Sequence, residues 1–494
     1  MRESNLLTIF GLIAEQSRAL IDFSRGEDSL NRLRRLYQAF DDRIGLSKAL
    51  KPIFLHPVPR GTGWWYVFGS ATLFAFILQV VTGITLATMY IPSTEHAYNS
   101  ISFITDEAAF GNLLRGIHYF GASAMILLVG IHAIRVYLTA AYKFPREVNW
   151  LSGSFLLLLT VLMAFTGQLL RWDQTAFWTV VVAAEQAGRT PFIGDYLAQF
   201  IIAGRTVGGA TLSRFFSFHV FFIPALIFGL LGLHLYLVLQ HGISEPPKSG
   251  RFVDPKTYRS WYQALLDREG IPFWPDVAWR DVVFSVLMIL VVVLLALIFG
   301  PKALGKPPDP TILEANPRPD WYLLWYFALL SLIPPVTENY VIIGAPLLAG
   351  VVLLALPFFF NRGERSPLRR PWAIGISVAI VLMVGTLTAI GRQSPWSPDF
   401  SAQPLSASVI GASSGPIYAG AQLFYKKGCE YCHQISGQGG LRGPNLTNVG
   451  DLLSRNEMSI RVLNGGVNMP AFASNITPEE LNLILDFLQS RKAP

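Results

Sequence analysis

Four histidines lie within long apolar stretches of this 494-residue chain, in two evenly spaced pairs. His118 and His132 are 14 residues apart, and His219 and His234 are 15 residues apart. About four turns of an α-helix separate the members of each pair, so both rings lie on one face of their helix. A polar ring in lipid is expensive and indicates function. Two such helices side by side predict two haem irons, each held between two imidazoles, a ligation suited to electron transfer.

The order of the helices predicts which histidines meet. One further apolar stretch lies between the two that carry histidines, so both of these cross the membrane in the same direction. We therefore expect His118 to face His219 near the outer side, and His132 to face His234 near the inner side. A lone membrane histidine is more often a satisfied packing residue, but two matched pairs favour iron ligation.

Small and basic residues around these histidines fit the same interpretation. Glycines 14 residues apart occur on the two neighbouring helices, where the lack of a side chain lets a flat macrocycle approach the backbone: Gly69, Gly83, Gly153 and Gly167. Glycine is also frequent in ordinary membrane-helix packing. Arg115 and Arg135 flank the first histidine pair and are candidates to bind haem propionates. The alternative is that both snorkel at the helix ends.

A second type of haem site lies near the C-terminus. Cys429 and Cys432, the two cysteines of the chain, stand directly before His433 in a C-x-x-C-H run. This spacing is that of covalent c-type haem attachment. Met469 is the expected second axial ligand, with Met458 as the competitor. A zinc site would need two more Cys or His ligands nearby, and a redox dithiol would need a βαβ context; the region has neither.

The composition indicates the elements that must position these groups. It is 52% hydrophobic and 14% charged, against about 25% charged in soluble proteins. Seven stretches can each cross a bilayer as a helix, near 65–90, 113–140, 151–171, 214–240, 280–300, 340–360 and 372–391. The net charge of +7 fits Lys- and Arg-rich cytoplasmic loops and not nucleic-acid binding. The N-terminus is then cytoplasmic and the C-terminus extracytoplasmic.

The predicted fold is all-α, a seven-helix transmembrane bundle with two b haems and a small extracytoplasmic helical domain with one c haem. We expect a cell-membrane (bacterial inner-membrane) multi-pass protein. The predicted divisions are a cytoplasmic amphipathic segment, a four-helix haem domain, a three-helix domain, a flexible Pro/Ser/Ala/Gly-rich linker and a monohaem domain, at 1–35, 36–245, 246–391, 392–416 and 417–494.

These motifs together resemble a known family, the cytochrome b of bc1 and b6f complexes. Residues 36–245 resemble cytochrome b6 through IHYFGASAMILLVGIHAIRVYLTAAYKFPREVNW, TGQLLRWDQTAFW and ATLSRFFSFH. Residues 274–391 resemble subunit IV through WPDVAWRDVVF and PRPDWYLLWYFALLSLIPP, and the tail resembles class I cytochrome c. The 15-residue histidine spacing and the three helices that follow are features of the b6-type proteins.

The resemblance implies a quinol-oxidising subunit. In the family, quinol is oxidised near the outer face, one electron crosses the membrane through two non-covalent b haems, and the other passes through a Rieske iron–sulfur protein to a c haem, with proton translocation. A P-E-W-Y carboxylate takes a quinol proton. Here the motif reads Pro319, Asp320, Trp321 and Tyr322, so Asp320 is the expected base although it is one methylene shorter.

The resemblance also implies partners: a Rieske protein, other bc-complex subunits, a dimeric complex, lipid, quinone, and a soluble cytochrome or terminal oxidase as acceptor. Cytochrome b6 carries an additional thioether-bound haem, but its cysteine is replaced by Val67 here. His241 is a weaker candidate for an inner quinone site. A rival function is a non-bifurcating electron conduit between the quinone pool and another redox enzyme, against which the PDWY motif and the subunit IV-like half both argue.

Overall fold

The computed structural model describes residues 31–493 except 33, 205, 310–317, 334, 395–397, 466–468 and 470. Most of the expected amphipathic segment at 1–35 lies outside the described residues. The fold is mostly helical, as predicted. Within the described part, seven helical spans are long and apolar enough to cross a membrane: α3 (Phe68–Ala87), α5 (Gly111–Leu138), α6 (Glu147–Leu169), the run from α9 to α10 (Gly209–His241), α12 (Ala278–Phe299), α14 (Pro335–Phe359) and α15 (Pro371–Gln393).

Two helix pairs form the centre of the bundle. The helix α3 packs along α5, and α6 packs along α10 (Ile223–His241), so each histidine-bearing helix lies against a glycine-bearing one. Apolar side chains from all four helices form the core between them, and they include Ala75, Met125, Leu128 and Ile227. From the second half of the chain, α12 adds to this core by packing on α5.

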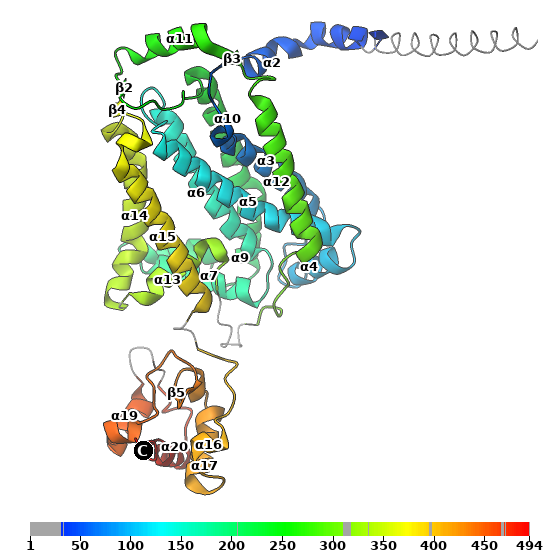
Figure 1. The fold of residues 1–494 in the computed structure, drawn as a ribbon. Coiled ribbons are helices and arrows are strands. Elements are labelled where there is room, and N and C mark those ends of the chain that lie inside the picture. Colours follow the sequence, from blue (N-terminus) through cyan, green and yellow to red (C-terminus); the bar gives the residue numbers. More distant parts are fainter. Residues whose placement is uncertain are drawn as a thin grey trace, which may run out of the picture.

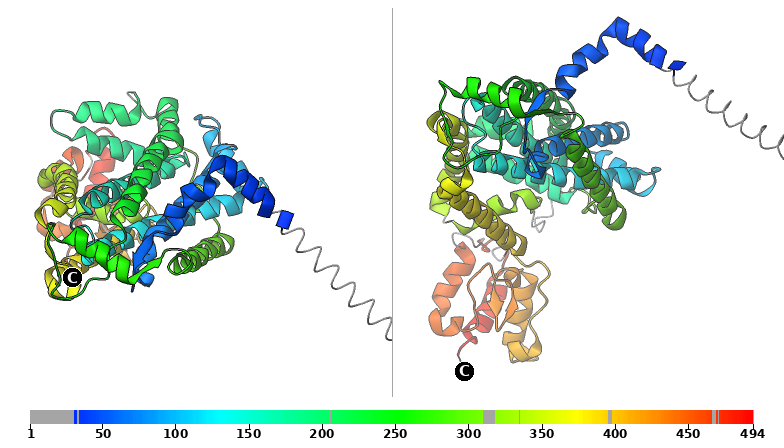
Figure 2. Two further views of the ribbon diagram at one scale, coloured as in Figure 1. Left: turned by 90° about the horizontal axis from the view of Figure 1, so that it is seen from above. Right: turned by 45° about the horizontal axis from the view of Figure 1, so that its top comes forward.

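Basic connections gather at one end of the bundle, with α2 (Leu46–Phe54) and α11 (Tyr258–Glu269) (Figure 1). Two short antiparallel pairs join distant segments at this end, namely β1 (Pro57–Pro59) with β3 (Gly270–Pro272), and β2 (Phe252–Val253) with β4 (Gly363–Glu364). Beside them, the Arg365 guanidinium donates to the Glu245 carboxylate in a buried ion pair. Seen from above, α2 runs outward from the bundle (Figure 2).

Short helices cover the opposite end of the bundle. They are α4 (Ala97–Asp106), α7 (Gln174–Gly188), α8 (Gly194–Ile202), η3 (Trp321–Leu323) and α13 (Leu324–Leu332). The C-terminal domain lies beyond this end, on the side of the bundle away from α2 and α11 (Figure 1). The basic loops and the C-terminal domain therefore lie at opposite ends, as seven crossings require.

The C-terminal domain is a small helical unit with its own core. It contains α16 (Ala407–Ile410), α17 (Gly415–Lys426), η5 (Cys429–Tyr431), β5 (Gln434–Ile435), β6 (Gln438–Gly439), α18 (Val449–Leu452), α19 (Arg455–Asn464) and α20 (Pro478–Gln489). The α17 and α20 helices cross closely at Gly420, where a Cβ atom would lie 2.0 Å from the Leu483 carbonyl oxygen. Thr477 caps α20 by accepting from the Glu480 amide.

Part of the predicted linker at 392–416 is packed on this domain. Leu405 and Ile410 are buried in the domain core, and the Arg491 guanidinium donates to the Ile410 carbonyl at 2.9 Å. The Asp399 amide donates to the Tyr431 carbonyl at 2.7 Å. Isolated apolar residues in a Pro- and Ser-rich stretch give no periodicity, so sequence reasoning placed the start of the packed domain too late.

Candidate functional site

The outer histidine couple forms between α5 and the start of the long α9–α10 run. The ring centroids of His118 and His219 are 6.3 Å apart, with the ring planes at 81°. Two imidazoles that bind one metal from opposite sides, each at about 2 Å, place their centroids roughly 6 Å apart. The separation of these two rings therefore fits a shared metal ion between them.

The second couple lies four turns further along the same two helices. His132 is on α5 and His234 is on α10, and the two rings are near enough to interact electrostatically. The structure thus brings together the pairs that the order of the helices predicted. Two stacked histidine couples inside one apolar bundle are what two membrane haems would need.

A turn of π-helix explains the unequal spacing of the two histidine pairs. The segment η2 (Phe218–Phe222) contains His219, and the Ile223 amide donates to the Phe218 carbonyl five residues back. Pro224 follows directly and has no amide hydrogen to continue the α-helical ladder. A π turn holds one extra residue. The 15 residues from His219 to His234 therefore span the distance that 14 span on α5.

Each predicted glycine contacts one histidine ring. A Cβ atom at the glycine would lie within 3.3 Å of the Cε1 atom of that ring for the pairs Gly69–His132, Gly83–His118, Gly153–His234 and Gly167–His219. The tightest case is Gly167, at 2.5 Å. The structure therefore places each of these glycines against a candidate haem ligand.

Hydroxyl groups next to these glycines fix the histidine tautomers. The Thr82 hydroxyl donates to the Leu78 carbonyl at 2.7 Å, so its contact with His118 Nδ1 at 2.9 Å must be accepted from the ring. Ser152 likewise donates to the Asn149 carbonyl and contacts His234 Nδ1 at 2.9 Å. A ring with its hydrogen on Nδ1 keeps the Nε2 lone pair for a metal.

The same tautomer is fixed at His219, whose Nδ1 lies 3.1 Å from the Met163 carbonyl, a group that can only accept. The Thr166 hydroxyl is 3.2 Å from the same nitrogen. His132 has no such bond among the residues that the structure describes, and the residue before its glycine is Phe68. Sequence reasoning missed these hydroxyls, although a Ser-Gly or Thr-Gly pair repeats at 82–83, 152–153 and 166–167.

The two arginines predicted to bind propionates differ in their surroundings. Arg135 is buried at 9% exposure and stacks 3.7 Å from the centroid of the Tyr66 ring, and its Nε and Nη2 have no hydrogen-bond partner among the described residues. A buried guanidinium with free donors fits an acidic group of a bound cofactor. Arg115 instead donates to Thr105 Oγ1 at 2.8 Å and to the Lys302 carbonyl at 2.7 Å.

A cavity of about 340 Å³ opens beside the outer histidine couple. Its lining is mainly apolar and is drawn from both halves of the chain: His118 and His219 from the first half, and Lys302, Asp320 and Tyr322 from the second, are among its residues. An enclosed apolar space with a few convergent polar groups is the usual form of a site for an apolar ligand.

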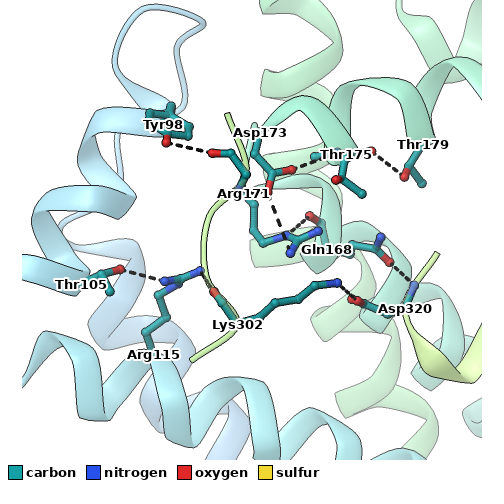
Figure 3. A network of polar contacts seen from close by, with 12 residues as sticks. Tyr98, Thr105, Arg115, Gln168, Arg171, Asp173, Thr175, Thr179, Lys302 and Asp320 are labelled. Atoms are coloured by element: carbon teal, nitrogen blue, oxygen red, sulfur yellow. Dashed lines mark hydrogen bonds and ion pairs between the residues drawn. The ribbon is translucent and has the colours of Figure 1, made fainter. Parts of the chain in front are cut away.

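Asp320 lines this cavity, and its side chain points towards that of Lys302 (Figure 3). Its carboxylate accepts from Lys302 Nζ at 2.5 Å, and its amide donates to Gln168 Oε1 at 3.3 Å. Asp320 precedes η3, but its side chain makes no capping bond there.

The other residues of the PDWY motif line or border the same space. Trp321 Nε1 donates to Ser123 Oγ at 3.2 Å, and the Tyr322 hydroxyl is buried without a partner in the described structure. Pro319 directly precedes Asp320 and leads the chain to the cavity edge. His241 lies elsewhere, at the end of α10, where Nδ1 contacts Asn149 Oδ1 at 2.9 Å. This bond makes His241 a satisfied helix-end histidine.

Comparison with known proteins agrees with this arrangement. The family described as Cytochrome b/b6/petB matches residues 54–242, and Cytochrome b(C-terminal)/b6/petD matches residues 307–409. Cytochrome b6 from Heliobacterium mobile is 42% identical over 203 residues, which are 41% of this chain and 95% of that protein. The chain belongs to the cytochrome b/b6 family.

Two further matches bear on this cytochrome b. The menaquinol:cytochrome c reductase cytochrome b subunit of Bacillus subtilis (strain 168) is 36% identical over 223 residues, 43% of this chain and 99% of that one. A solved structure titled "Hyperthermophilic respiratory Complex III" aligns with a TM-score of 0.61 and 27% identity, covering 72% of this chain and 91% of that chain. The chain is thus a membrane cytochrome b/c subunit of a bc-type quinol:cytochrome c reductase complex.

The C-terminal domain of this cytochrome b matches, at residues 416–488, the family described as Cytochrome C oxidase, cbb3-type, subunit III. Its His433 Nδ1 lies 2.9 Å from the Pro444 carbonyl, which leaves Nε2 unprotonated for iron. Burial raises the pKa of the Cys429 thiol to about 12, unlike the lowered pKa of a redox dithiol. Met469 borders the domain core, whereas Met458 is buried within it.

We predict that Gly167→Ala displaces the His219 ring and removes the outer b haem, because the new Cβ would lie 2.5 Å from Cε1. Roughly half of the b-haem absorbance should be lost in the reduced-minus-oxidised spectrum of the purified chain. Gly229→Ala on α10 is the matched control, since a Cβ there meets open space. A full b-haem spectrum in Gly167→Ala would contradict this assignment.

We also predict that Met469→Ala lowers the c-haem midpoint potential, by on the order of 0.1 V or more, because thioether ligation raises it. A redox titration of the c-haem band measures this. Met458→Ala should instead lower thermal stability, by about 2–5 kcal/mol for a buried methionine, and leave the potential near that of the parent chain. The reverse pattern would make Met458 the ligand.

Proposed function

We propose that this chain oxidises quinol at the Asp320 end of the outer cavity, beside the haem that His118 and His219 would hold, as the cytochrome b/c subunit of a complex that also contains a Rieske iron–sulfur protein. The observation that carries the proposal is one cavity that contains both the outer histidine couple and the Asp320 carboxylate. A pure electron conduit would need the histidine couples but no acid–base group beside them. The cavity therefore favours a catalytic site over the conduit.

The haems of this proposal are held by named side chains. His118 with His219, and His132 with His234, would bind two non-covalent b haems, and Arg135 would face a propionate. Cys429 and Cys432 would bind one c haem covalently, with His433 and Met469 on its iron. When bound, these haems supply one-electron transfer across the membrane and out of it. The protein supplies ligand orientation through the Nδ1 hydrogen bonds and an apolar enclosure that excludes water.

Asp320 is the proposed proton acceptor. A quinol hydroxyl must lose its proton as it is oxidised, and a carboxylate at the polar edge of an apolar cavity is placed to accept it. Trp321 and Tyr322 border the quinol ring site, and Ser123 holds the Trp321 indole by a hydrogen bond. The proton would then leave towards the outer face, which links oxidation to proton release.

The quinol and the partners follow from the same proposal. The relative from Bacillus subtilis is named for menaquinol, so we propose menaquinol as the first quinol to test.

Both cysteines of the chain belong to the C-x-x-C-H run, so an iron–sulfur centre must come from a partner subunit. The C-terminal domain, on the outer side, would pass electrons to a soluble cytochrome or a terminal oxidase. A dimeric complex with further bc subunits is expected, with the basic loops and the N-terminus on the cytoplasmic side of the bacterial membrane.

We predict that Asp320→Asn keeps the haem content but slows quinol oxidation by on the order of 10², the contribution of a general base. Quinol-dependent reduction of the c haem measures the rate. Asp320→Glu, which keeps the carboxylate, should retain most of the activity. Asp276→Asn, which neutralises an exposed aspartate outside the cavity, is the charge control. Unchanged turnover in Asp320→Asn would remove this residue from the proton path.

A further inference from the structure

The loop after α12 places a lysine, Lys302, at the edge of the outer cavity. Lys302 lies three residues beyond α12, and its Nζ donates to Asp320 Oδ1 at 2.5 Å. The Lys302 side chain is 38% exposed and that of Asp320 is 13% exposed. The pair thus spans the boundary between the enclosed cavity and the surface, with the lysine on the outer side.

This loop is held in place by a set of bonds to the first half of the chain (Figure 3). Arg115 binds the Lys302 carbonyl at 2.7 Å, and the Tyr98 hydroxyl donates to the Gly305 carbonyl at 2.9 Å. The Gly305 amide donates to Asp173 Oδ2 at 3.1 Å. A backbone held at Lys302 and at Gly305 keeps the ammonium within reach of one carboxylate.

Few other charges face Asp320. Arg171, at the end of α6, pairs with Asp173 at 3.9 Å and also interacts with the Tyr322 hydroxyl. The hydroxyl groups of Tyr119, on α5, and Tyr322 are the uncharged titratable groups near the Asp320 carboxylate. Lys302 is the cation that contacts Asp320 directly, and Arg171 already has a carboxylate of its own.

We propose that Lys302 is the positioning residue that returns Asp320 to its proton-accepting form after each quinol oxidation. An ammonium group has donors and no acceptor, so it stabilises the ionised carboxylate of Asp320 much more than the neutral acid. The inference rests on the proposed role of Asp320 as the base. Lys302 lies in the loop after α12, outside the PDWY motif, so the inference adds a second residue to the proposed site.

The proton balance of the cycle is simple. The Asp320 carboxylate accepts one proton from a quinol hydroxyl and becomes a neutral carboxylic acid, which attracts the ammonium of Lys302 much less. Loss of that proton to water at the exposed side of the pair restores the carboxylate, and the ion pair with Lys302 forms again. The lysine keeps its own three protons throughout. Its attraction for the charged form favours loss of the proton from Asp320, and water can take that proton at the exposed side of the pair.

The test compares Lys302→Gln, Lys302→Arg and Lys306→Gln in purified complex that contains the full-length chain. Lys306 is the matched control, because it is an exposed lysine of the same loop and carries the same charge. The probe is menadiol, and the readout is its rate of c-haem reduction from pH 5 to 9. We expect Lys302→Gln to slow the rate about tenfold at acidic pH, as the loss of a coupled pair implies. The acid side of the pH–rate profile should also move to higher pH.

Lys302→Arg should restore the parent profile, and Lys306→Gln should match the parent chain. The double variant Asp320→Asn with Lys302→Gln should be no slower than Asp320→Asn alone. If Asp320→Asn is slow but Lys302→Gln has the parent pH profile, the inference about Lys302 is overturned and the proposed function stands. If Asp320→Asn itself is active, the proposed base is wrong and the inference fails with it. A uniform loss of rate without a change in the pH profile would show a merely structural lysine.

Discussion

A neutral imidazole buried in a bilayer has one donor and one acceptor nitrogen, and both must find partners without water. In this chain the Nδ1–H group of three membrane histidines donates to a carbonyl or hydroxyl oxygen on the glycine-bearing helix. The three are His118, His219 and His234. The acceptor nitrogen of each remains, and the proposed haem iron would be its partner. The adjacent glycine lets each ring approach the backbone closely enough to make its bond.

Helix pairing in the bundle depends on this constraint. The histidines on α5 need the glycines of α3, and those on the α9–α10 run need the glycines of α6. The π turn at His219 belongs to the same requirement, since it keeps two ligands 15 residues apart on one face. Once the four helices are paired in this way, the outer end is closed by the loop that carries Lys302 and by the PDWY segment, and the cavity forms between the two halves.

Much of this arrangement could be predicted from the sequence because it is periodic. The seven spans follow from apolar length, and the histidine couples follow from spacing and helix order. The π turn could not be read from periodicity, although Pro224 after His219 marks a break in the ladder. Lys302 was missed because it pairs with Asp320 across a long connection, and no local pattern records such a contact. The packed start of the C-terminal domain was missed because Leu405 and Ile410 are isolated apolar residues.

We propose that four membrane histidines and one C-x-x-C-H run hold three haems of two kinds. A pyridine haemochrome assay on the purified chain, before and after acid–acetone extraction, tests it most directly. We expect two extractable b haems for each c haem that stays bound to the protein. One extractable haem would mean that a histidine couple is not a haem site, and a third would require a site that these residues do not provide.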